Sequence, residues 1–253
     1  MKPLLFSTFH IIRNLLNPFL RFREVSILCY HSISDDQSET SVSANRFEEH
    51  IKTLKGAGYD FVSLEEIFVW FSKNASVPQK AVGLSFDDGY ADFKTTVLPI
   101  LEKYNISATL FLVGDREQYR LNLGTDLAML SDADVVELQK HPLISFGWHT
   151  KTHPNLGILP KESMAQEIIP PTPMSFFAYP GGNYSENAIN AVQNAGFSAA
   201  FSIKRDLVSR GKNRWLLPRV VILKSDSGKD LEYYVSVAQH WYASLRNFFK
   251  KYG

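Results

Sequence analysis

Short β-rich runs alternate with helical patterns along most of this 253-residue chain. The β-rich runs combine β-branched and aromatic residues and cover residues 25–30, 59–62, 81–86, 108–113, 143–147, 176–179, 199–203 and 217–223. Helical patterns, some with readable caps, cover residues 43–57, 90–104, 131–140, 161–168 and 185–195. Such alternation predicts an α/β fold around a parallel sheet, which is either open or closed into a barrel.

Polar and turn-forming clusters follow three of the predicted strands. Asp87 and Asp88 come directly after one strand, His149 and His153 after another, and residues 179–182 (Tyr-Pro-Gly-Gly) close a third. In parallel α/β folds the functional groups gather at the carboxyl ends of the strands, where the loops leave the sheet. The sequence therefore predicts one functional site at the carboxyl ends of these strands.

The residue types in these clusters are those of a catalytic metal site. Two histidines four residues apart, His149 and His153, can converge on one ion, although such a pair alone is a weak signal. Asp88 supplies a third, anionic ligand, and two histidines with one carboxylate leave a coordination position open for water. Asp87 then remains free to take a proton from that water, whose pKa a metal lowers towards about 7. Without the histidines, the two aspartates before Gly89 would read as an acidic turn.

The composition limits the remaining possibilities. The formal net charge is +1, so bulk electrostatics exclude a nucleic-acid binder. Cys29 is the one cysteine in the sequence, which excludes an intrachain disulfide and a thiolate-rich zinc site. It lies in an apolar run. With 45% hydrophobic residues, residues 24–253 are expected to form a single domain with one substantial core.

Residues 1–23 form a basic amphipathic pattern that is separate from the α/β pattern. Drawn as a helix, their polar residues share one side and their large apolar residues the other. This pattern fits either a helix on a membrane surface or a helix packed against the domain or a partner. The segment lacks the unbroken apolar centre of a cleavable signal peptide or a membrane span. A cytoplasmic location, or a peripheral one on the membrane surface, is therefore expected.

The motifs together resemble those of a known family. Ser-Phe-Asp-Asp-Gly-Tyr at 85–90, His-Thr-Lys-Thr-His-Pro-Asn-Leu at 149–156 and Phe-Ala-Tyr-Pro-Gly-Gly at 177–182 are similar to motifs of the polysaccharide deacetylases with a NodB-homology domain. The resemblance implies a distorted (β/α) barrel that removes N-acetyl groups from amino sugars with a divalent metal, most often Zn²⁺. It also implies that Asp87 is the catalytic base and that the metal ligands are Asp88, His149 and His153.

The resemblance extends to both ends of the domain. Members similar to the exopolysaccharide N-deacetylases carry an early Tyr-His pair, here Tyr30-His31, whose histidine is implied to be the acid that protonates the departing amine. His240 near the C-terminus is the alternative acid. Many members hold the base with an arginine at the position of Ala178, and here the resemblance implies that Arg219 of Leu-Pro-Arg does so instead.

The third motif carries the predicted contacts to the substrate. Gly181 stands where an aromatic residue is usual, so its backbone N–H can still stabilise an oxyanion but no side chain lines the sugar. Tyr179 and Tyr90 are further candidates for contact with the substrate. Exposed aromatic side chains could stack on a sugar, and the aromatic residues that flank the motifs are Tyr90, Trp148, Tyr184 and Trp215. The proline-rich segment 170–173 shortens the groove region.

The predicted activity is hydrolysis of acetamido groups on a glycan of a surface polysaccharide or its precursor. One alternative is an enzyme acting on a lipid- or nucleotide-linked sugar or on an O-acetyl ester. Another is a non-catalytic glycan-binding module of the same fold, which would not require the full set of aspartates and histidines. The expected partner is a glycan and not a nucleic acid, and the sequence does not indicate an oligomeric state.

Overall fold

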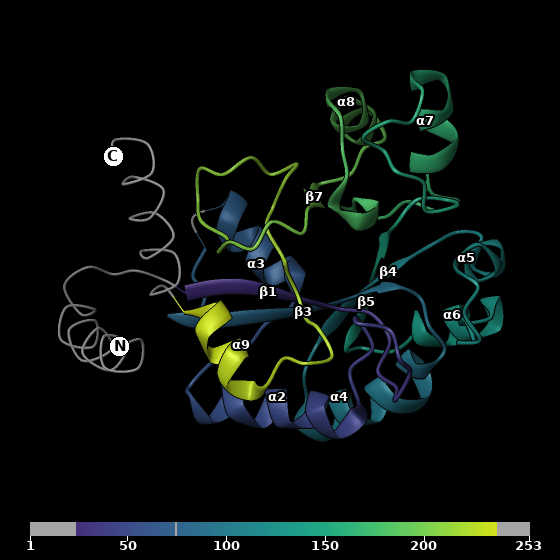
Figure 1. Cartoon of the computed structure of the whole chain (residues 1–253). Helices are drawn as coiled ribbons and strands as arrows, with labels where there is room; N and C mark the ends of the chain where they lie inside the picture. Colours follow the sequence, from purple (N-terminus) through teal and green to yellow (C-terminus); the bar gives the residue numbers. More distant parts are fainter. Residues whose placement is uncertain (1–23, 74, 237–253) are drawn as a thin grey trace, which may run out of the picture.

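A computed structural model describes residues 24–73 and 75–236 of the chain (Figure 1). Within these residues eight strands form one parallel sheet in the order β7-β6-β5-β4-β3-β1-β8, with β2 paired to β3. The strands are β1 (Glu24–Tyr30), β2 (Asp60–Phe61), β3 (Lys80–Asp88), β4 (Ala108–Leu112), β5 (Ile144–Trp148), β6 (Phe176–Ala178), β7 (Ala199–Phe201) and β8 (Val220–Val221). The predicted α/β fold with a parallel sheet is confirmed.

Helices flank this sheet on both sides. They are α2 (Ala44–Gly56), α3 (Leu64–Ser72), α4 (Leu98–Tyr104), α5 (Arg116–Leu123), α6 (Asp132–Leu138), α7 (Lys161–Ile168), α8 (Glu186–Asn194) and α9 (Gly228–Val235). Figure 1 shows α2, α4 and α9 below the sheet, α3 above β1, and α7 and α8 together at the top right. The apolar face of α2 packs Phe47, Ile51 and Leu54 into the main core.

One short segment curls the sheet towards a barrel. Leu217 pairs in parallel with Phe201 of β7, while Val220 and Val221 pair with β1 at the other edge of the sheet. Backbone hydrogen bonds fix both contacts, since Leu217 N–H donates to Ala200 at 2.9 Å and Ile222 N–H donates to Cys29 at 2.9 Å. The segment 217–221 therefore links the two edges, and the predicted distorted (β/α) barrel is confirmed.

Several helices differ from the sequence prediction. The predicted helix 90–104 is divided into a π-helical turn, η1 (Phe93–Val97), and α4, whose first turn contains Pro99. Proline has no amide hydrogen for the regular α-helical bond, which favours a change of helix type here. The helices α3, α5 and α9 were not predicted. Helix α3 has a readable signal, because Ser63 and Glu66 form a reciprocal capping box at its N-terminus.

The predictions for the two ends of the chain are not tested by this structure. Residues 1–23, with their predicted amphipathic helix, and residues 237–253, with the alternative acid His240, lie outside the described residues. Among the residues that are described, no helix has the length and apolar character that crossing a membrane requires.

Close packing around β5 supports the site that follows this strand. A Cβ atom added to Gly147 would overlap the Phe111 ring and lie 3.0 Å from the Phe176 carbonyl oxygen. Gly147→Ala is therefore expected to lower the free energy of unfolding by about 1–3 kcal/mol through overpacking, measured by urea denaturation. Gly56→Ala in α2 is the matched control, because nothing lies within 4 Å of the added atom. Equal stability of the two variants would contradict the packing described here.

Candidate active site

The carboxyl ends of β3 and β5 bring three potential metal ligands together. Asp88 ends β3, and His149 follows β5 directly, with His153 in the loop beyond it. Asp88 Oδ1 lies 3.5 Å from His149 Nε2 and 3.6 Å from His153 Nε2. One ligand atom from each of the three residues lies within 4.8 Å of the other two. The structure thus places the three predicted ligands in one cluster.

The protonation pattern of this cluster fits a divalent cation. Asp88 Oδ1 is buried and has no hydrogen-bond partner among the described residues, so a carboxylate oxygen is left available. His149 Nδ1 donates to the Ala178 carbonyl at 2.8 Å, which leaves Nε2 as the nitrogen that faces the cluster with its lone pair. Burial, followed by the neighbouring His149, lowers the pKa of His153 to about 4. A neutral imidazole is the form that binds metal.

The second oxygen of Asp88 is held by a residue that the sequence analysis did not identify. Tyr119 in α5 donates its hydroxyl to Asp88 Oδ2 at 3.0 Å, and its ring packs 4.6 Å from the His153 ring. Both Tyr119 and Tyr90 are less than one-tenth exposed. Tyr90 directly follows the aspartate motif and was predicted to contact the substrate. Tyr119 belongs to α5, a short polar helix in which no motif marks it.

The backbone around the cluster has positive φ values, which residues other than glycine rarely adopt. Asp88, Thr150 and His153 have φ values of 76°, 69° and 61°. Each such residue stores strain that the surrounding structure must hold in place, and strain of this kind concentrates at functional sites. Thr150 Oγ1 accepts the His153 N–H at 3.0 Å. The hydroxyl and amide of Thr152 both donate to Glu167 in α7 at 2.8 Å, so the loop is anchored on both sides.

The neighbouring aspartate has a different partner. Arg219 donates to both oxygens of Asp87, at 2.6 and 2.8 Å, and to Ser85 Oγ at 3.1 Å. Both side chains are buried, with Arg219 0% and Asp87 3% exposed. Burial by itself would raise the pKa of Asp87, but the charge and hydrogen bonds of the Arg219 guanidinium, together with the neighbouring His149, outweigh burial and hold that pKa well below its usual range. Asp87 is therefore a buried carboxylate that stays ionised.

A second group of potential ligands includes Asp87 itself. Cys29, His31 and Asp87 also bring one ligand atom each within 4.8 Å, and the Cys29 thiol donates to Asp87 Oδ2 at 3.4 Å. Burial raises the pKa of this thiol well above its usual value, so the thiolate that a metal needs is disfavoured. Arg219 already occupies both Asp87 oxygens and would repel a cation. The cluster of Asp88 and the two histidines is thus the better metal site.

The structure also locates the predicted acid and oxyanion donor. His31 follows β1, at the same carboxyl end of the strands, and is half-buried. Its Nδ1 atom is buried without a hydrogen-bond partner in the described residues. Gly181 is exposed in the short turn η2 (Pro180–Gly182), with φ 56°. This left-handed conformation favours glycine over the usual aromatic residue. Tyr179 is fully buried, so its predicted contact with the substrate stays a prediction.

The aromatic residues that flank the motifs differ in exposure. Tyr90 is 8% and Trp148 4% exposed, so both belong to the packed interior. Trp215 is half-buried under the Arg214 guanidinium. Tyr184 is 42% exposed, with its ring against Tyr179, and can contact a ligand from the surface.

Comparison with known proteins places this site in a family. The sequence model of the polysaccharide deacetylases matches residues 74–200, half of the 253-residue chain. The chain belongs to the polysaccharide deacetylase family. A poly-beta-1,6-N-acetyl-D-glucosamine N-deacetylase of Staphylococcus aureus is 28% identical over 237 residues, which cover 85% of this chain and 77% of the relative.

Solved structures show the same fold. The Streptococcus pyogenes deacetylase PplD, solved with acetate, has a TM-score of 0.71 at 24% identity and covers 84% of this chain and 98% of its own. IcaB from Ammonifex degensii also has a TM-score of 0.71, at 21% identity, covering 83% of this chain and 96% of its own. Polysaccharide deacetylases depend on a divalent metal, and the cluster of Asp88, His149 and His153 fits such an ion.

The buried pair of Asp87 and Arg219 generates a stability prediction. Arg219→Met leaves the Asp87 carboxylate buried without its cation, so the free energy of unfolding should fall by about 3–5 kcal/mol. Adding Asp87→Asn removes the stranded charge and should recover part of this loss. Arg120→Met is the control, because its partner Glu117 is exposed and solvent screens such surface pairs, so this substitution should change the free energy of unfolding much less. Urea denaturation at about pH 7 measures all four proteins, and a loss for Arg219→Met no larger than for Arg120→Met would contradict the pairing.

Proposed function

We propose that this chain is a zinc-dependent hydrolase that removes N-acetyl groups from amino sugars of a surface polysaccharide or its precursor and releases acetate. The observation that carries the proposal is the division of two adjacent carboxylates. Asp88 has an unpartnered oxygen facing His149 and His153, whereas Asp87 is held ionised by Arg219 and is not needed as a ligand. The relative from Staphylococcus aureus, named as an N-deacetylase of poly-beta-1,6-N-acetyl-D-glucosamine, supports an amino-sugar substrate.

The donor set favours zinc among divalent ions. Two imidazole nitrogens and one carboxylate oxygen, from His149, His153 and Asp88, match the composition of catalytic zinc sites with an open position. An ion held there would lower the pKa of a bound water and polarise the carbonyl oxygen of the acetamido group.

The side chains around the cluster would carry out the proton transfers. Asp87 Oδ2 lies 3.8 Å from His149 Nε2, so the ionised carboxylate stands beside the ligand cluster and is placed to accept a proton from water. Arg219 orients this carboxylate through both of its oxygens. His31, with its unpartnered Nδ1, would donate a proton to the nitrogen of the departing amine. The Gly181 N–H would donate to the oxyanion.

A binding module on the same fold is less well supported. Glycan binding alone needs neither an ionised carboxylate next to a ligand cluster nor a buried arginine to hold it. Burial of that pair is energetically unfavourable unless its hydrogen bonds are well made, and here Arg219 bonds both Asp87 oxygens and Ser85. A buried ion pair between Asp87 and Arg219 beside the ligand cluster therefore favours a catalytic role.

The first test of the function is deacetylation of N-acetylglucosamine oligomers, followed by mass spectrometry for loss of an acetyl group. Treatment of the purified protein with a chelator should abolish the activity, and added Zn²⁺ should restore it. The reason is that the proposed reaction needs the ion to lower the pKa of the attacking water and to polarise the acetamido carbonyl. Release of acetate that persists without metal would contradict the proposal.

The second test separates the two aspartates. Asp87→Asn should lower kcat at least about 100-fold, because a general base contributes on this order, while the zinc content stays that of the unsubstituted protein. Asp88→Asn should instead lose the zinc. Asp60→Asn, at an exposed carboxylate of β2, is the control and should change neither quantity. If Asp87→Asn lost its metal, the assignment of Asp87 as the base would be wrong.

A further inference from the structure

Tyr119 in α5 contacts two of the three residues in the ligand cluster. Its hydroxyl donates to Asp88 Oδ2 at 3.0 Å, and the centroid of its ring lies 4.6 Å from that of the His153 ring. The tyrosine is 6% exposed, so water has little access to these contacts. No step of the proposed reaction uses this hydroxyl. Its role must therefore lie in what it does to the ligands.

The two carboxylate oxygens of Asp88 have different surroundings. Oδ1 is buried, has no hydrogen-bond partner among the described residues, and lies 3.5 Å from His149 Nε2 and 3.6 Å from His153 Nε2. Oδ2 accepts the Tyr119 hydroxyl. A carboxylate can bind a metal through one oxygen or through both, and a hydrogen bond to one oxygen favours binding through the other. Asp88 is therefore prepared to offer one oxygen to an ion.

Helix α5 is fastened to both segments that carry the ligands. The backbone N–H groups of residues 114 and 115, directly before α5, donate to the carbonyls of Thr150 and Lys151 at 2.9 and 2.7 Å. These carbonyls lie in the loop between the two histidine ligands. On the other segment, a Cβ atom added to the glycine that follows Asp88 would lie 3.1 Å from Arg116 Cδ, so α5 approaches this turn closely. The position of Tyr119 is thus tied to the ligands that it contacts.

We propose that Tyr119 is a positioning residue that fixes Asp88 as a ligand through Oδ1 alone and thereby strengthens zinc binding. The inference rests on the proposed function, because it takes the cluster of Asp88, His149 and His153 to be a zinc site. A side chain that is already oriented loses less conformational freedom when it binds an ion. One oxygen from Asp88 and two imidazoles make three protein ligands, the number that leaves a position open for water at a catalytic zinc.

The zinc affinity of the full-length chain tests this inference without any substrate. The metal-free protein is titrated with Zn²⁺ in competition with a chromophoric chelator, which gives the zinc Kd. Tyr119→Phe removes the hydroxyl but keeps a ring beside His153, and its zinc Kd should rise about 10–100-fold, because loss of a partner behind a metal ligand has effects of this size. Tyr119→Leu removes the ring as well and should bind zinc no more tightly than Tyr119→Phe. Near-UV circular dichroism checks that both variants retain fixed tertiary packing.

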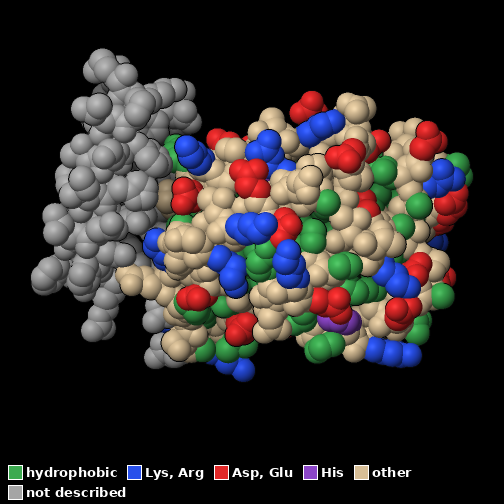
Figure 2. Space-filling view, turned by 90° about the horizontal axis from the view of Figure 1, so that it is seen from below, with side chains coloured by type: hydrophobic (Ala, Val, Ile, Leu, Met, Phe, Trp, Pro, Cys, Tyr) green, Lys and Arg blue, Asp and Glu red, His purple; other side chains and the backbone are tan. Residues whose placement is uncertain are grey.

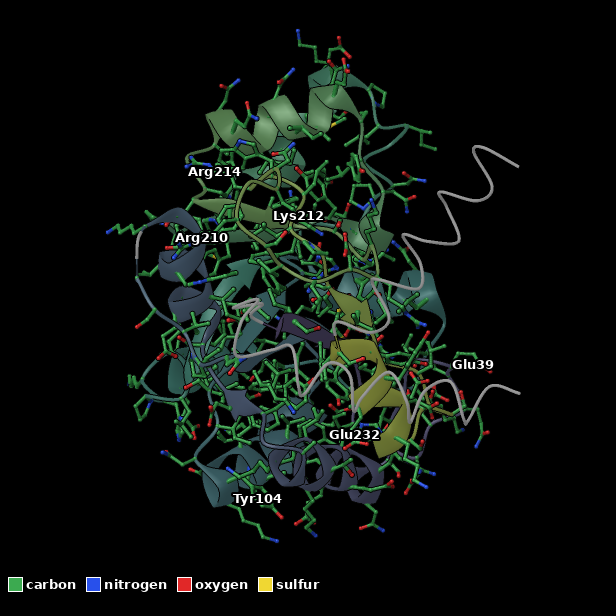
Figure 3. The ribbon with its side chains drawn as sticks, turned by 90° about the vertical axis from the view of Figure 1, so that its left-hand side faces the viewer. Glu39, Tyr104, Arg210, Lys212, Arg214 and Glu232 are labelled. Carbon is green, nitrogen blue, oxygen red and sulfur yellow. The ribbon has the colours of Figure 1, made fainter. Side chains whose placement is uncertain are left out.

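Tyr104→Phe is the matched control, because it also removes a tyrosine hydroxyl that donates to a carboxylate. Tyr104 is the last residue of α4 and donates to Glu48, which keeps its ion pairs with Lys52 and Lys103 in the variant. Figure 3 shows Tyr104 at the lower edge of the molecule, and Figure 2 shows acidic and basic side chains interspersed over the face that contains α2 and α4. The zinc Kd of Tyr104→Phe should equal that of the unsubstituted protein.

The possible outcomes separate this inference from the proposed function. If Tyr119→Phe binds zinc as tightly as the unsubstituted protein, the inference is overturned and the proposed zinc site stands. An equal rise in the zinc Kd of Tyr119→Phe and Tyr104→Phe would also overturn it, because the effect would then not act through Asp88. Failure of the unsubstituted protein to bind zinc would overturn both the inference and the proposed zinc dependence.

Discussion

The buried ion pair between Asp87 and Arg219 is the interaction on which the site depends. An arginine with no exposed surface is tolerated in a core when its charge is neutralised and its donors are used. Here both Asp87 oxygens and Ser85 Oγ accept from the guanidinium, and the Phe111 ring lies 5.0 Å beneath it. Arg219 can reach Asp87 because its segment bridges the two edges of the sheet. The same segment therefore closes the barrel and brings Arg219 to the proposed base, Asp87.

The pair also explains why adjacent aspartates can do different work. Successive side chains of a strand point to opposite faces, so two neighbouring aspartates would normally face apart. Asp88 departs from this pattern with a φ of 76°, a left-handed conformation at the last residue of β3. Its Oδ1 turns towards His149 and His153 while Asp87 remains directed at Arg219. The left-handed backbone at Asp88 thus turns its carboxylate towards the histidines, and the Tyr119 hydroxyl bonds the other oxygen of that carboxylate.

The sequence predicted the parts of the site that lie next to strand ends. Asp87, Asp88, His149 and His153 could be found because polar clusters after β-rich runs are visible in one dimension, and the family resemblance then led to His31 and Arg219. Tyr119 could not be found in this way, because α5 is short and polar and buries little besides this tyrosine. Cys29 lies in an apolar run of the sequence and is buried, but its contact with Asp87 joins residues 58 positions apart and follows only from the pairing of β1 with β3. The division of the helix expected at 90–104 likewise reflects local backbone geometry that periodicity does not record.

The central claim is that the metal binds on the Asp88 side of the aspartate pair and leaves Asp87 to act on water. Anomalous X-ray diffraction at the zinc edge, on crystals of the zinc-loaded protein, locates the ion directly. The account predicts one strong peak at about 2.0–2.2 Å from Asp88 Oδ1, His149 Nε2 and His153 Nε2, with both Asp87 oxygens still bonded to Arg219. A peak among Cys29, His31 and Asp87 would contradict it.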